Sequence, residues 1–459
     1  MTVVVEKSPS PKGTPIFLTD ARRLPRFRDR LTAAQRQWLE SGGFEGKPHT
    51  FALIPGPDGR VESVVSGCGN GNGDGAWALA HLPAKLPPGC YVIGKGPVSI
   101  DPADAAFGWS LGGYRFSRYK KRNGELATLA LPRSAAVNAA LEEAGAVALV
   151  RDMVNTPAED MGPAEIAAIV RAEAKSHGAT FSEVVGDELL RRNFPAIHAV
   201  GRAATRGPRL IELNWGNPKH PRLAIVGKGV CFDTGGVDIK GAEGMRLMKK
   251  DMGGAAHAIA LARLVMAHRL PYRLQLLVPA VENAISGNAY RPGDIFKTRA
   301  GHTIEIGNTD AEGRVILCDA LAYAVEQSPK MIIDFATLTG AARVALGPEV
   351  PAMFANDDRL ARRLERASLA VGDPLWRLPL WRNYRRLFDS DMADFNNSGR
   401  GGFAGAIVAA LFLDYFVPGD VAWAHFDTYA WNDASRPGRP VGGEAQGLRA
   451  ALAALRARS

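Results

Sequence analysis

Apolar, strand-like runs alternate with helical patterns through the last two thirds of the chain, and this alternation limits the possible folds more than any other feature. The segments 222–226, 274–278 and 331–335 have the pattern of buried strands. Helical patterns fill 253–268 and 313–327. Strands that alternate with helices favour a parallel or mixed sheet covered by helices, which is an α/β fold. Ligands of such sheets bind just beyond the carboxyl ends of the strands.

The chain has 459 residues, which suggests two or three domains at ~150 residues each. We predict a smaller N-terminal domain over residues 1–140, whose role is not evident, and a connecting helix or linker over 141–160. A larger C-terminal domain then occupies 161–459. A helical pattern at 135–154 leads out of the first domain, and a helix at 164–176 opens the second.

Composition excludes several classes of protein. Hydrophobic residues make up 46% and charged residues 22%, so the chain is neither disordered nor fibrous. No apolar run reaches the ~18 residues that a membrane span needs, and the N-terminus does not resemble a signal peptide. The four cysteines contain no CxxC pair, which argues against a disulfide framework or a thiolate zinc site. We therefore expect a reduced, cytoplasmic protein.

The N-terminal third contains a glycine run at 67–75 and basic clusters at 22–30 and 115–122. The glycine run would cradle a phosphate if it joined a strand to a helix, but no Lys-Ser/Thr follows it, so a surface loop is favoured. The basic clusters are typical of solvated faces. With a net charge of +9, nucleic-acid binding is possible without being indicated.

Acidic residues in glycine-rich turns are the strongest chemical signal. Asp233, Asp251, Asp310 and Glu312 all lie near predicted helix starts, and Lys228 stands between glycines after a buried strand. Four clustered carboxylates repel one another unless a cation lies between them, and two hard divalent ions would accommodate all four. Each Asp taken alone is also explained as a helix cap or turn former. The sequence contains no HExxH motif, and His257 is better explained by packing near the site than as a ligand.

Several motifs in this region resemble the leucine aminopeptidase family, the dinuclear-metal exopeptidases also called cytosol aminopeptidases. The signature heptapeptide NTDAEGR stands at 308–314. Supporting motifs, in the family's order, are VGKGVCFDTGG, KKDMGGAAHA, VPAVENAISG, RPGD, ATLTGA, WRLPL and WAHFD. The resemblance covers roughly residues 150 to 450. It implies a variable N-terminal α/β domain and a larger catalytic domain with a mixed sheet.

Carried over by position, the resemblance implies a pair of divalent metal ions. Asp233 and Glu312 would bridge the ions, Lys228 and Asp251 would complete the tighter site, and Asp310 would complete the more exchangeable one. Manganese or zinc is expected, with magnesium or cobalt as alternatives. An amine ligates a metal only when it is deprotonated, so the pKa of Lys228 would have to be far below its usual value.

The resemblance also implies a mechanism in which a metal-bridging hydroxide attacks the scissile carbonyl. Lys240 would stabilise the oxyanion, and Arg314 would hold a bicarbonate ion that shuttles the proton to the leaving amine. Leu338 would offer its backbone carbonyl to the peptide. The substrate-contacting positions would be completed by Met248, Thr337 and Gly340, of which Met248 and Thr337 line the pocket for the first side chain.

Two segments depart from the family pattern. The family usually continues WAHFD with Ile-Ala-Gly, whereas this chain has Thr-Tyr-Ala-Trp-Asn at 428–432. Tyr429 would narrow the first-residue pocket or give it a polar end, which shifts preference away from leucine, and Trp431 adds to the departure. The usual turn near the C-terminus is also altered, to Gly-Glu-Ala-Gln-Gly at 443–447.

The predicted function is metal-dependent removal of the N-terminal residue from short peptides. The resemblance further implies a homohexamer whose active sites face an inner cavity. Two alternatives are a DNA-binding accessory protein, suggested by the basic N-terminal third, and a non-catalytic scaffold. The scaffold is disfavoured because Lys240 and Arg314, which it would not need, are both present.

Overall fold

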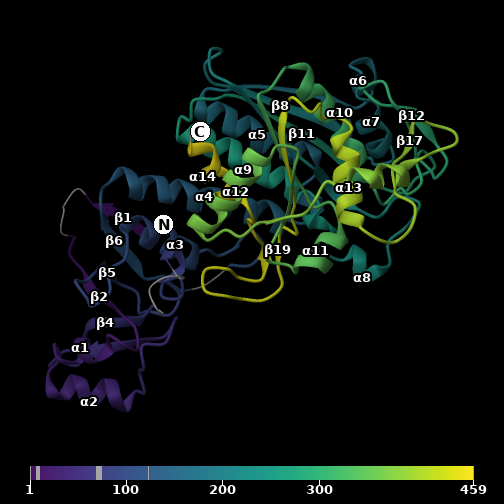
Figure 1. Ribbon diagram of the computed structural model, residues 1–459. Helices are drawn as coiled ribbons and strands as arrows, with labels where there is room; N and C mark the ends of the chain where they lie inside the picture. The colour runs from purple at the N-terminus through teal and green to yellow at the C-terminus, as the bar shows by residue number, and fades with distance from the viewer. Residues whose placement is uncertain (1, 7–10, 69–74, 122–123, 458–459) are drawn as a thin grey trace. The chain divides into compact units, whose positions relative to one another are not determined.

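The computed structural model of the protein describes residues 2–6, 11–68, 75–121 and 124–457. The chain forms two compact units (Figure 1): Met1–Ala148 with Ala434–Val441, and Leu149–Asp433 with Gly442–Ser459. No helix within the described residues is both long and apolar enough to cross a membrane.

The described part of the first unit is built on a six-stranded sheet. In sheet order its strands are β1 (Val3–Glu6), β6 (Thr128–Pro132), β5 (Cys90–Ile93), β2 (Thr14–Thr19), β4 (Val61–Gly67) and β3 (Phe51–Pro55). The edge pair β3–β4 is antiparallel, and the remaining pairings are parallel. The accompanying helices are α1 (Leu24–Arg28), α2 (Ala33–Ser41) and α3 (Pro102–Gly112). The predicted α/β character of the N-terminal domain is confirmed.

A small apolar cluster joins the first two helices to this sheet. Phe27 of α1 and Leu39 of α2 are buried together with Ile54 of β3 and Val65 of β4. In the basic cluster at 22–30, most arginines are exposed, in agreement with a solvated face. Most of the glycine run, residues 69–74, lies outside the described residues.

The second unit contains, within its described residues, a nine-stranded mixed sheet. Its strands are β16 (Trp376–Arg377), β15 (Ala352–Ala355), β18 (Ala422–Asp427), β14 (Met331–Ala336), β9 (Arg222–Gly227), β11 (Arg273–Asn283), β8 (Arg209–Trp215), β7 (Thr180–Val185) and β10 (Gly229–Asp233). Strands β18, β14, β9 and β11 run parallel, whereas β15, β8 and β7 pair antiparallel. The predicted mixed sheet and its three buried strands are confirmed.

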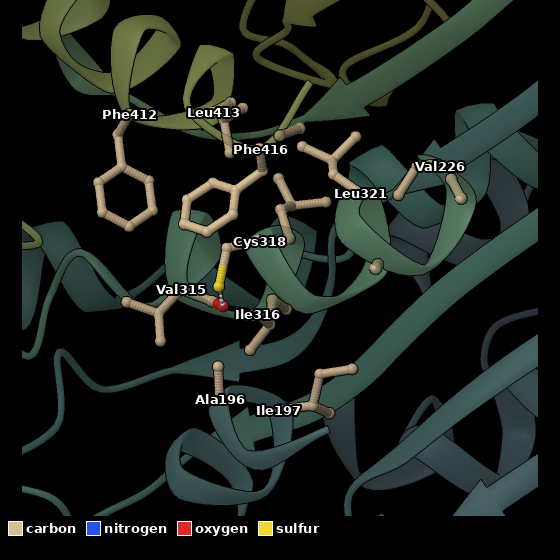
Figure 2. Packing of buried hydrophobic residues seen from close by; sticks show 14 of the residues in the cluster. Ala196, Ile197, Val226, Val315, Ile316, Cys318, Leu321, Phe412, Leu413 and Phe416 are labelled. Carbon is tan, nitrogen blue, oxygen red and sulfur yellow. Dashed lines mark hydrogen bonds between the residues drawn. The ribbon is translucent and has the colours of Figure 1, made fainter. Parts of the chain in front are cut away.

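Helices cover both faces of the central strands. Ala224 and Val226 of β9 belong to an apolar cluster with α10 (Glu312–Glu326), and Figure 2 shows part of this cluster around Cys318. Successive side chains of a strand point to opposite faces, so Leu223 and Ile225 face the other side. There α9 (Gly253–Ala267) packs on β9, β14 and β11. The helices predicted at 253–268 and 313–327 are therefore confirmed.

The remaining elements extend or connect these layers. The helices are α4 (Ala135–Asn155), α5 (Pro163–His177), α6 (Glu188–Arg191), α7 (Pro195–Gly201), α8 (Ala242–Met245), α11 (Gly340–Leu346), α12 (Asp358–Val371), α13 (Gly405–Asp414) and α14 (Leu448–Arg456). Short strands are β12 (Ile295–Lys297), β13 (Thr303–Glu305), β17 (Phe395–Asn396), β19 (Trp431–Asn432) and β20 (Gly442–Gly443).

The carboxyl ends of the parallel strands meet at one edge. Phe335 of β14 pairs with Gly227 of β9, and Ala336 pairs with Asp427 of β18, so the segments that follow these strands are neighbours. One expectation needs correction: Asp233 is not near a helix start but is the last residue of β10. The buried Val230 and Cys231 continue the chain as a strand beside β11, and the glycines around them obscure this in the sequence.

Asp319 links α10 to the beginning of α7. It is fully buried, and its carboxylate accepts hydrogen bonds from the backbone N–H groups of Ala196 at 2.8 Å and Arg299 at 2.8 Å. We expect Asp319→Ala to lower the free energy of unfolding by about 2–4 kcal/mol, because it leaves these buried donors without acceptors. Asp319→Asn keeps one acceptor and is expected to cost less. Thermal melting of both variants would test this; equal melting temperatures for Asp319→Ala and the unmodified protein would contradict it.

Candidate active site

A cavity of about 650 Å³ lies where the segments after β9, β14 and β18 meet. Every site residue predicted from the sequence lines it: Lys228, Asp233, Lys240, Met248, Asp251, Asp310, Glu312, Arg314, Thr337, Leu338, Gly340 and Tyr429. Trp431 does not line the cavity. The structure thus brings together positions that lie up to two hundred residues apart in the chain.

Lys228 lies at the centre of the acidic cluster. Its backbone joins β9 to β10, and its side chain is 3% exposed. The Nζ atom lies 2.9 Å from Asp251 Oδ2 and 2.9 Å from Glu312 Oε1, and it donates to the Thr337 carbonyl at 2.9 Å. A Cβ atom at Gly313 would come within 2.6 Å of the Lys228 side chain, so the glycine of the heptapeptide makes room for this lysine.

Asp233 is positioned by hydrogen bonds to one oxygen and faces a cation with the other. Its Oδ1 accepts from the backbone N–H of Gly235 and the side-chain amide of Asn283, both at 2.8 Å. Its Oδ2 lies 2.9 Å from Lys240 Nζ, which also forms an ion pair with Asp310. The Asn283 amide also donates to the Thr309 carbonyl at 3.1 Å, so it ties the Asp233 turn to the heptapeptide loop.

The close packing of charged groups in the cluster shifts their pKa values. Burial and the charge of Asp233 raise the pKa of Asp310, although Lys240 and Lys228 oppose this shift. The pKa of Glu312 is raised by burial and by the charges of Asp233 and Asp251, against the opposing effect of Lys228. Burial also raises the pKa of Asp251. For Lys228, burial would lower the pKa, but Asp251 and Glu312 outweigh it and raise the pKa above its usual value. The lowered pKa expected of a lysine ligand therefore has to come from the charge of a bound cation.

This donor set fits divalent cations. Oxygen atoms of Asp233, Asp310 and Glu312 all lie within 4.8 Å of one another. Asp251 Oδ2, Asp310 Oδ1 and Glu312 Oε1 are buried and accept no well-aligned hydrogen bond, although each lies at ion-pair distance from a lysine. A hard cation bound among such close, buried carboxylates would stabilise their ionised form and offset their mutual repulsion.

Lys240 and Arg314 also line the cavity, close to the acidic cluster. For Lys240, burial would lower the pKa, but Asp233 and Asp310 outweigh it and raise the pKa, so the amine stays protonated. Burial lowers the pKa of Arg314 to about 10, which still leaves it charged at neutral pH. Its Nη1 donates to the Asn397 carbonyl at 3.1 Å, whereas its buried Nε has no hydrogen-bond partner among the described residues.

The loop after β14 is held from two sides. The Thr337 hydroxyl contacts Asp251 Oδ1 at 2.8 Å, so Thr337 orients a candidate ligand as well as lining the cavity. The Asp427 carboxylate accepts from the backbone N–H of Leu338 at 3.0 Å and from the Thr339 hydroxyl at 2.6 Å. No pattern in the sequence indicates a role for Asp427, although it ends the WAHFD motif.

His257 has a packing role, as the sequence indicated. It is fully buried and contacts the Gly253 carbonyl through Nδ1 at 2.7 Å, while its Nε2 accepts from the backbone N–H of Gln446 at 2.9 Å. Burial lowers its pKa to about 4, so the ring is neutral at physiological pH.

The two segments that depart from the family pattern are bonded to each other. Ala430, where the resemblance leads us to expect glycine, adopts a positive φ of 55°, a conformation that alanine disfavours. The Gln446 side-chain oxygen accepts from the Ala430 backbone N–H at 2.9 Å and from the Thr428 hydroxyl at 2.9 Å. Gln446 thereby holds the turn that carries Tyr429.

Tyr429 forms one wall of the cavity together with basic residues. The Lys250 ammonium lies 4.9 Å from the centre of its ring, and the Arg343 guanidinium lies 4.7 Å from it. Burial lowers the pKa of Lys250 to about 8, which leaves it mainly protonated at pH 7. No pattern in the sequence indicates that Lys250 or Arg343 belongs to the site, although Lys250 stands within the KKDMGG motif.

Comparison with known proteins supports the family suggested by these motifs. A family model described as "Cytosol aminopeptidase family, catalytic domain" matches residues 148–452, and the "M17 aminopeptidase, N-terminal domain" model matches residues 14–132. A probable cytosol aminopeptidase of Syntrophotalea carbinolica is 43% identical over 466 residues, which cover 94% of this chain and 93% of the relative. The N-terminal match covers a region that lies outside the motifs of the resemblance.

Solved structures agree with this result. The crystal structure of a cytosol aminopeptidase from Coxiella burnetii has a TM-score of 0.95 and 48% sequence identity, and the match covers 99% of each chain. The bottromycin maturation enzyme BotP, in complex with Mn, has a TM-score of 0.84 and 33% identity, covering 93% of this chain and 96% of BotP. The chain therefore belongs to the cytosol aminopeptidase family of metal-dependent aminopeptidases.

Proposed function

We propose that the protein removes the N-terminal residue from short peptides by metal-assisted hydrolysis, with this cavity as its active site. The observation that carries the proposal is the convergence of five candidate ligands with Lys240 and Arg314 at one cavity. Asp233 and Glu312 would bridge the metal pair, Lys228 and Asp251 would complete the tighter site, and Asp310 the more exchangeable one. Bound there, the metal ions would acidify a water molecule and anchor the substrate's α-amine.

The protonated Lys240 amine is the proposed oxyanion stabiliser. It lies beside Asp233 and Asp310, so its charge is already oriented next to the proposed ligands before the carbonyl is attacked. A fixed donor of this kind stabilises the charge that develops on the carbonyl oxygen. Leu338 is proposed to offer its carbonyl to the peptide, and Met248, Thr337, Gly340 and Tyr429 to contact the first residue.

Arg314 is the proposed holder of a bicarbonate ion, which would carry the proton to the leaving amine. The Arg314 Nε donor, buried without a hydrogen-bond partner in the described chain, supports an oxyanion partner. A guanidinium binds a planar oxyanion through two hydrogen bonds and keeps its charge.

Two further features of the proposal come from family membership. One is a homohexamer with inward-facing active sites, which would restrict substrates to short peptides. The other is the metal: manganese or zinc is proposed, with magnesium or cobalt as alternatives, because oxygen-rich sites accept several of these ions. The complex of the relative BotP with Mn supports manganese.

Metal removal is the direct test of the function. We expect chelator-treated protein to lose hydrolysis of aminoacyl amides, and single addition of Mn, Zn, Mg or Co to restore release of free amino acids. The substrates should be a panel of amides, with peptides blocked at the N-terminus as the control that an exopeptidase leaves intact. Folded protein that stays inactive with every metal, or that cleaves the blocked peptides equally well, would overturn the proposal.

A further inference from the structure

The wall of the cavity around Tyr429 carries positive charge without a matching anion. Lys250 is 6% exposed, and its ammonium makes no hydrogen bond or ion pair within the described chain. The Arg343 side chain contacts the Tyr429 side chain, and it forms no ion pair with a carboxylate of the described residues. Both cations lie over the Tyr429 ring, and such contacts stabilise a cation without neutralising its charge.

The carboxylates nearest this wall have other partners. Asp251 lies against Lys228 and the Thr337 hydroxyl. Asp427 accepts hydrogen bonds from Leu338 and Thr339. Asp433 lies at the far end of Tyr429, 3.4 Å from its hydroxyl. A lysine that is 6% exposed, lines a cavity and has no anionic partner is unusual, because burying an unpaired charge is costly.

We infer that Lys250 and Arg343 select peptides whose first side chain ends in a carboxylate, namely aspartate or glutamate. The inference rests on the proposed function, which assigns the Tyr429 wall to the first-residue pocket. An entering carboxylate supplies the missing anion and accepts charge-assisted hydrogen bonds from both basic groups. Tyr429 holds the two cations at the wall and occupies space that a branched apolar side chain would fill. A first residue of lysine or arginine is repelled by the same charges.

The isosteric pair glutamate and glutamine isolates the effect of charge. With the manganese-loaded full-length enzyme, we expect kcat/KM for the glutamyl amide to exceed that for the glutaminyl amide by about tenfold or more. The lysyl amide is expected to be the poorest substrate of the panel. Binding of the products glutamate and glutamine, followed by ligand-observed NMR, gives a readout that does not depend on turnover.

Three variants locate the source of the preference. Lys250→Met and Arg343→Met keep much of the side-chain volume, and each is expected to lower the glutamyl-to-glutaminyl ratio severalfold. Lys249→Met is the matched control, because Lys249 is the neighbouring lysine but donates to the Asn155 carbonyl and does not line the cavity. It should leave the ratio unchanged. Arg343 is exposed, so its variant stays informative if Lys250→Met fails to fold.

The outcomes separate the inference from the function on which it rests. Hydrolysis of leucyl and glutaminyl amides with a glutamyl-to-glutaminyl ratio at or below one would overturn the inference and leave the aminopeptidase function intact. A ratio that survives both Lys250→Met and Arg343→Met would overturn the assignment to these residues. Failure to hydrolyse any amide with any metal would overturn the proposed function itself.

Discussion

Glu312→Ala is expected to abolish hydrolysis and binding of the metal pair together. Glu312 is 1% exposed, and oxygens of Glu312, Asp233 and Asp310 lie within 4.8 Å of one another. Loss of a ligand proposed to contact both ions leaves neither metal site complete. It also leaves Lys228 with one carboxylate partner fewer in a buried site. Metal content after dialysis and hydrolysis of aminoacyl amides should therefore fall to background in the same preparation.

Two controls make this result interpretable. Glu188→Ala removes a partly exposed glutamate of α6 that pairs with Arg191, and it should retain both metal and activity. Glu312→Gln keeps the side-chain volume and removes the charge, so a folded Glu312→Gln protein without metal would separate loss of ligation from misfolding. Full activity of Glu312→Ala would contradict the site assignment.

Lys240→Ala is expected to reduce turnover by about two or three orders of magnitude, as loss of an oxyanion donor does. Metal content should not fall, because Lys240 Nζ pairs with Asp233 and Asp310, two proposed ligands, and its loss removes a competing cation. The effect should appear mainly in kcat, since the interaction is strongest when charge develops on the carbonyl oxygen.

Lys219→Ala serves as the control for this variant, because Lys219 is exposed in a turn that does not line the cavity. Its kinetic constants should match those of the unmodified protein. Unchanged turnover in Lys240→Ala would show that this lysine is not catalytic. A parallel loss of metal and turnover would assign it to metal binding instead.

Much of the fold could be predicted because its signals are local. The largely apolar run 222–226 predicts a strand from its own residues, without reference to the rest of the chain. Likewise, Pro163 and Gly178 mark the two ends of α5 in the sequence. The return of 434–441 to the first unit was not predictable, because no short-range pattern records which unit a loop joins. The strand β10 was missed for the opposite reason: its flanking glycines suggest a turn more strongly than three apolar residues suggest a strand.

The candidate ligands could be named because each stands in a compact motif at a strand end or helix start. The residues that hold them could not, because their bonds join distant parts of the chain. Asn283 donates to Asp233 across 50 positions, and Asp427 accepts from Leu338 across 89. Lys250 is adjacent to Asp251, yet whether it has a counter-ion depends on the groups that packing brings near it.

The hydrogen bond that the Ala430 N–H donates to Gln446 couples two segments that are distant in the chain. A chain with glycine at 430 adopts the left-handed turn without help, whereas this chain relies on an amide supplied from near its C-terminus. Transplanting residues 428–432 alone into a relative would move the pocket wall without its support. A chimaera intended to transfer the specificity of this enzyme must therefore carry both 428–432 and 443–447.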